Sequence, residues 1–120
     1  MFQRFAAIVV FLFFTGESAA QEFAFVLVNG TQYQIREVHL SSANMNNYGP
    51  NVLRPPDVKP GEARTVDFRG YVVDCNVDLK VVFASIDTQP VWQYLNLCNL
   101  KRIKLQYDQM SGVPTATYDD

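Results

Sequence analysis

Few residues in this 120-residue chain could carry out acid–base or nucleophilic chemistry, and they are far apart in the sequence. His39 is the only histidine, so a hydrolase would need it beside a serine or cysteine and a carboxylate. No nucleophile-elbow pattern accompanies it. Strand alternation turns His39 away from Val38 and Leu40, and we therefore expect a solvent-facing side chain and no catalytic residue.

A second candidate pair, Asp78 and Lys80, is two residues apart in a strongly alternating stretch, so both share one strand face. We expect that face to be solvated, where an exposed pair contributes little. If a sandwich covers it instead, the pair becomes a candidate site. Other carboxylates are spread among turns without calcium-loop spacing, so we expect no metal and no cofactor: Glu62, Asp67, Asp74 and Asp87.

The stretch most suggestive of binding is residues 44–53, within a long irregular segment (42–62) that holds four of the six prolines. Asn47, Tyr48 and Asn51 are the candidate binding residues, because amides and a rigid aromatic ring are typical of recognition loops. The alternative, which we favour, is a loop folded over the end of the domain. In that case Tyr48, Val52 and Leu53 would plug the core.

The N-terminus has the three parts of a secretory signal peptide. Arg4 is followed by an apolar run over residues 5–14, about half the length that spans a bilayer. The small residues Ser18-Ala19-Ala20 then place the cleavage after Ala20, or after Ala19. An uncleaved anchor would need a longer run. We expect a periplasmic or secreted protein with no stable membrane insertion after cleavage.

The two cysteines, Cys75 and Cys98, are best explained by this export. An even number of cysteines in an exported chain favours a disulfide. A redox pair usually has two residues between its cysteines, and a metal site needs further ligands nearby. We therefore predict a structural Cys75–Cys98 bond.

Charge excludes two classes of partner. The formal net charge is −2, without the clustered Lys and Arg of a nucleic-acid-binding surface or a basic membrane patch. We expect no nucleic-acid partner, and the oligomeric state does not follow from the sequence.

Short apolar segments with turn signals between them, and no long amphipathic helix, indicate an all-β fold. We predict a small antiparallel sandwich or barrel of about six to seven strands in one domain, residues 21–107. A flexible tail, residues 108–120, would follow. The alternation changes phase near Arg36-Glu37, which predicts a β-bulge. The best-patterned strand is 75–84, with Cys75 on its core face. The six expected strands cover residues 23–28, 33–40, 65–68, 75–84, 91–94 and 102–107.

Several short motifs, taken as a set, cover most of residues 23–107: Val28-Asn29, Gly49-Pro50-Asn51-Val52-Leu53, Pro60-Gly61, Cys75 through Val81, Trp92 and Asn96-Leu97-Cys98. The set resembles a group of small exported proteins of Gram-negative bacteria, some of which are labelled argininosuccinate lyase. That enzyme is a large, helical, cytoplasmic tetramer, so the label does not fit an exported β domain of this size. The resemblance implies no specific activity.

These observations favour a non-enzymatic periplasmic binding or accessory domain that contacts a protein or another envelope component. One alternative is a secreted inhibitor or effector. The other is a small hydrolase that uses His39 with a carboxylate.

We predict that the exported protein begins at Gln21. Signal peptidase should cut after Ala20 because small residues fill the positions that it recognises. The intact mass of protein from a periplasmic extract measures this directly. A full-length mass confined to the membrane fraction would instead indicate an anchor.

Overall fold

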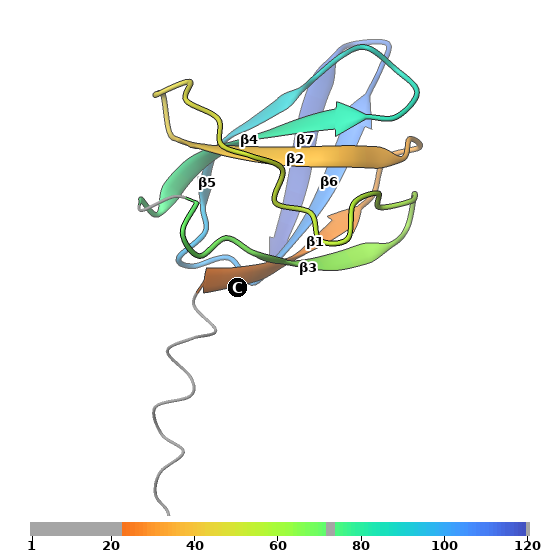
Figure 1. The fold of residues 1–120 in the computed structure, drawn as a ribbon. Helices are drawn as coiled ribbons and strands as arrows, with labels where there is room; N and C mark the ends of the chain where they lie inside the picture. The colour runs from red at the N-terminus through yellow and green to blue at the C-terminus, as the bar shows by residue number, and fades with distance from the viewer. Residues whose placement is uncertain (1–22, 72–73, 120) are drawn as a thin grey trace, which may run out of the picture.

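Seven strands make up the regular structure of the computed structural model, which describes residues 23–71 and 74–119 (Figure 1). The predicted signal peptide, residues 1–20, lies outside the described residues. Within the described part of the chain there is no α-helix. The strands are β1 (Ala24–Asn29), β2 (Ile35–Ser42), β3 (Ala63–Asp67), β4 (Asn76–Phe83), β5 (Val91–Asn96), β6 (Arg102–Asp108) and β7 (Val113–Asp119).

The strands form two sheets that pack as a sandwich and do not close into a barrel. One sheet has the order β3-β1-β6-β7 and the other the order β2-β4-β5. All pairs are antiparallel except β1 and β6, which run parallel in the register Val26↔Arg102. The all-β prediction is confirmed. Because β1 and β2 belong to different sheets, the turn after Asn29 carries the chain across the sandwich.

The core lies between the two sheets and follows the alternation of the strands. Leu27 and Ile103 come from one sheet, and Leu79 and Val81 come from the other; all four are fully buried. Burial of each such side chain stabilises the fold by about 1.5–3 kcal/mol. The stability of a domain this small depends on nearly all of these buried side chains.

The corner after β1 is held by a buried asparagine. Asn29 Nδ2 donates to the carbonyls of Tyr33 (2.8 Å) and Val58 (2.9 Å), while its Oδ1 accepts from Thr31 N (2.9 Å). The next residue must be glycine, because a Cβ on Gly30 would lie 2.6 Å from Leu105 O. The Asn-Gly pair therefore lets the chain pass close to β6.

Two strands carry bulges. In β2, the register shifts between Ile35 and Glu37, which confirms the bulge predicted at Arg36-Glu37. In the β4–β5 ladder, Val77 pairs with Leu95 but Leu79 pairs with Trp92, so β5 contains one extra residue there.

The predicted flexible tail, residues 108–120, is wrong for most of its length. Val113–Asp119 forms β7, which pairs with β6 from Asp108↔Val113 to Arg102↔Asp119. An edge strand of a sandwich needs few apolar residues, so its sequence looks like a polar tail. Trp92 Nε1 also donates to Thr115 O (2.7 Å) and ties β5 of the other sheet to β7.

The predicted disulfide is confirmed. Cys75 and Cys98 are bonded, with 5.2 Å between their Cα atoms. The bond joins the residue before β4 to the turn that follows β5, where Leu97 N also donates to Cys75 O (2.9 Å). Cys75 was expected on the core face, but it is exposed because β4 begins only at Asn76.

We predict that the Cys75→Ser/Cys98→Ser variant loses about 3 kcal/mol of unfolding free energy, because opening this loop gives the unfolded chain more freedom. Urea denaturation followed by Trp92 fluorescence measures the loss. Reduction of the wild-type protein should shift its curve by a similar amount. Two free thiols in the native protein, or an unshifted curve, would contradict this assignment.

Candidate functional site

Residues 43–58, here called the covering segment, run along the free edge of β2 and over part of the outer face of the β2-β4-β5 sheet (Figure 1). Gly49 N donates to Leu40 O (3.0 Å), and Val52 N donates to Val38 O (2.9 Å). Farther along, Val58 and Ile35 exchange backbone hydrogen bonds in both directions. The covering segment therefore closes the free edge of β2, which would otherwise expose unpaired backbone groups.

Asn51, one of the candidate binding residues, holds this arrangement together. Its Oδ1 accepts from Val38 N (2.9 Å) and from Leu53 N (3.1 Å). Val52 and Leu53 are buried, which confirms that this end of the loop plugs the core. The Asn51 side-chain oxygen is thus engaged inside the protein.

Tyr48 and Lys80 form a pair on the covered face. Lys80 Nζ lies 4.4 Å from the centre of the Tyr48 ring, within the range of a cation–π interaction. Lys80 is half-buried, so its expected exposure was wrong. Tyr48 was expected to plug the core, but it is also half-buried and lies over the outer face. Burial, followed by the negative charge of Asp78, raises the pKa of the Tyr48 hydroxyl, which stays neutral.

Asp78 was expected to be exposed, and this was wrong: only 4% of its surface is accessible. Its Oδ2 accepts from Asn44 N (3.0 Å) and its Oδ1 from Tyr94 N (3.1 Å). Asn44 and Tyr94 both have a positive φ, 68° and 57°, a conformation that side chains disfavour. One buried carboxylate therefore holds the first turn of the covering segment and the bulge of β5.

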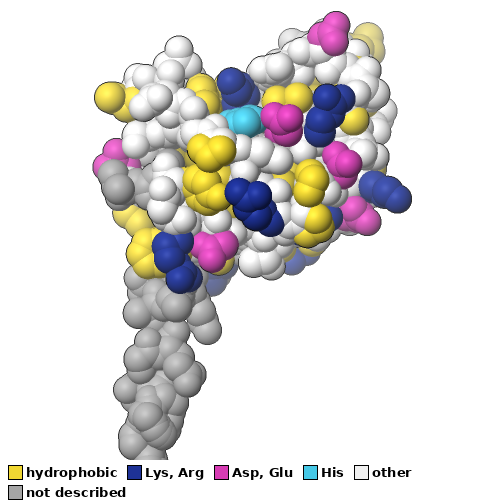
Figure 2. Space-filling model, in the orientation of Figure 1, with side chains coloured by type: hydrophobic (Ala, Val, Ile, Leu, Met, Phe, Trp, Pro, Cys, Tyr) yellow, Lys and Arg dark blue, Asp and Glu magenta, His cyan; other side chains and the backbone are white. Residues whose placement is uncertain are grey.

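His39 was expected to face solvent, but its side chain is only 18% accessible. Nδ1 lies 2.7 Å from Gly49 O, and Nε2 lies 2.7 Å from Glu37 Oε1. Figure 2 shows the histidine at the surface beside an acidic side chain. Both ring nitrogens thus face acceptors within the fold, and among the described residues neither contacts a serine or cysteine. This arrangement favours a role in fastening the covering segment.

The start of the covering segment is exposed although its backbone is fixed. Met45 N donates to Ser42 O (3.0 Å), and Asn47 N donates to Ser41 Oγ (2.9 Å). The Asn44 side chain contacts the hydroxyl of Tyr94. Met45 and Tyr94 are 67% and 59% exposed, and Asn46 and Asn47 are exposed as well. We call residues 44–47 together with Tyr94 the loop tip.

The structure thus separates the three candidate binding residues. Asn47 lies in the loop tip, Tyr48 lies over Lys80, and Asn51 is used for internal hydrogen bonds. Met45 and Tyr94 were not among the candidate binding residues predicted from the sequence. Met45 could have been noticed as a lone apolar residue among asparagines, whereas the exposure of Tyr94 depends on a bulge that local patterning does not indicate.

No metal centre is evident: the described residues contain no group of three His, Cys, Asp or Glu side chains that could hold an ion. Among the same residues no helix is long and apolar enough to cross a membrane.

No protein-family model, curated protein or solved structure matches this chain.

We predict that Asp78→Ala costs about 3 kcal/mol of unfolding free energy, because two backbone amides lose a charged acceptor. Asp78→Asn should lose less, since one acceptor oxygen remains. Urea denaturation measures both. Asp87→Ala, at an exposed site, is the control and should change stability by less than about 0.5 kcal/mol. Equal curves for Asp78→Ala and Asp87→Ala would rule out this role for Asp78.

Proposed function

We propose that this protein is an exported, non-enzymatic binding or accessory domain of the periplasm, and that its loop tip contacts a protein or another envelope component. The observation that carries the proposal is the exposure of Met45 and Tyr94 on a backbone whose conformation is already fixed. Methionine and aromatic side chains are typical of the centres of protein interfaces.

A fixed loop has an energetic advantage in binding. Ordering a loop and its side chains on association reduces affinity, so a loop that is ordered beforehand avoids most of this loss. Here the ordering comes from hydrogen bonds to β2 and from Asp78, and the exposed amides of Asn46 and Asn47 add hydrogen-bonding capacity. The combination of apolar contact and adaptable polar groups is common in recognition loops.

We predict that Met45→Asp abolishes capture of the specific partner, because a charge would have to be desolvated at the centre of the contact. The matched control is Met110→Asp: Met110 is 97% exposed, in the connection between β6 and β7 and outside the loop tip. Tagged wild-type and variant proteins are cross-linked in the periplasm, and the captured proteins are compared by mass spectrometry.

The proposal requires a partner that wild type and Met110→Asp capture and that Met45→Asp loses. Melting curves check that all three proteins are folded. If Met45→Asp retains every partner that Met110→Asp retains, the loop tip is not the contact surface.

A further inference from the structure

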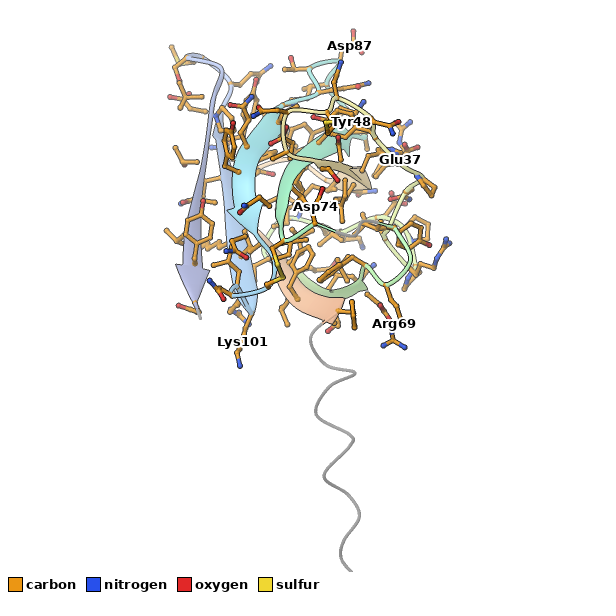
Figure 3. All side chains as sticks on the ribbon, turned by 90° about the vertical axis from the view of Figure 1, so that its left-hand side faces the viewer. Glu37, Tyr48, Arg69, Asp74, Asp87 and Lys101 are labelled. Carbon is orange, nitrogen blue, oxygen red and sulfur yellow. A yellow bond between two sulfur atoms is a disulfide. The ribbon has the colours of Figure 1, made fainter. Side chains whose placement is uncertain are left out.

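A second surface, separate from the loop tip, is a pocket of about 370 Å³ at an open side of the sandwich. It lies between the end of the covering segment and the chain that runs from β3 to Tyr71. In Figure 3, Tyr48, which directly follows residues 44–47 of the loop tip, lies well apart from Arg69 of the pocket. The lining residues are Val52, Arg54, Thr65, Asp67, Arg69 and Tyr71.

The lining is rich in hydrogen-bond donors. Arg54 Nη2 donates to the Tyr71 hydroxyl (3.0 Å), so the phenol accepts there and keeps its own proton to donate. The guanidinium has further N–H groups in a planar fork. Thr65 is exposed and offers a hydroxyl, while buried Val52 gives the pocket an apolar wall.

Charge in the pocket is positive although the chain is acidic. Two arginines and one aspartate line it, whereas the whole chain has a formal charge of −2. One carboxylate oxygen of Asp67 is engaged in a local hydrogen bond, because Oδ1 accepts from Arg69 N (3.0 Å). Asp67 Oδ2 lies 3.7 Å from Arg69 Nη2, and both side chains are more than half exposed, so solvent screens this ion pair. The Arg69 guanidinium also lies 5.7 Å from the centre of the Phe23 ring.

We propose that this pocket binds the oxyanion of an acidic ligand, a phosphate or a carboxylate group. Guanidinium groups match the planar geometry of such anions with paired hydrogen bonds, and the hydroxyls of Tyr71 and Thr65 supply further donors. A pocket of this volume also admits part of the molecule that carries the anion. The site is independent of the loop tip.

The proposal is tested by titration of the isotope-labelled protein with phenyl phosphate, with benzoate and with neutral benzyl alcohol, followed by amide NMR shifts. We expect the two anions, but not the alcohol, to shift amides of residues 52–54 and 65–71. Whichever anion binds tighter identifies the ligand as phosphate-bearing or carboxylate-bearing.

Arg54→Gln should weaken anion binding by roughly tenfold, since a charged donor pair is lost. Arg36→Gln is the matched control: it removes the same charge from an exposed arginine that donates to Ala84 O, outside the pocket. Tyr71→Phe keeps the ring and should weaken binding severalfold, which provides a second variant if Arg54→Gln does not fold.

The proposal is overturned if neither anion binds at millimolar concentrations. Shifts scattered outside the pocket would also overturn it, as would equal weakening by Arg36→Gln and Arg54→Gln.

Discussion

The Asp78 carboxylate fixes two segments that come from opposite sides of β4. Its two oxygens accept the amides of Asn44 and Tyr94, both of which have a positive φ. Without an acceptor at this position, each segment would have to hold a disfavoured conformation while leaving a backbone donor unsatisfied. The first turn of the covering segment and the bulge of β5 therefore depend on one side chain, and so does the loop tip that they form together.

The four sheet edges explain why the covering segment is needed. β2 is an edge strand of eight residues, and the covering segment occupies its free side. The opposite edge, β5, is interrupted by the positive φ of Tyr94. β3 has only five residues and carries charged side chains, and β7 contains Pro114. Each of these features discourages an edge strand from pairing with a strand of another chain, which is the general hazard of an open sandwich.

The features that depend on interactions between neighbouring residues, or on composition, were predicted correctly from the sequence. The alternation over residues 77–83 identified β4, the phase change at Arg36 identified the bulge of β2, and the cysteine count identified the disulfide. The errors at Asp78 and His39 share one cause, which is contact with residues distant in sequence. Asp78 and His39 follow the outward parity of their strands, as expected, but the covering segment folds over them. β7 was missed because an edge strand with Pro114 and Ala116 as its inward residues has little apolar signal.

The covering segment contributes to both proposed surfaces. Residues 44–47 form the loop tip beside Tyr94 of β5, and Val52 and Arg54 line the pocket, whose other lining residues lie in and after β3. Asn51 and Leu53 anchor the middle of the covering segment, and Arg54 follows directly after the buried anchor. Because Leu53 is fixed in the core, the position of the Arg54 backbone is fixed as well. A segment that must be rigid to protect β2 therefore presents side chains on both sides of its anchored middle in defined positions. Such a segment can acquire binding residues at exposed positions with little loss of stability, since its hydrogen bonds to the sheet use mainly its own backbone groups together with the side chains of Asn51 and Asp78.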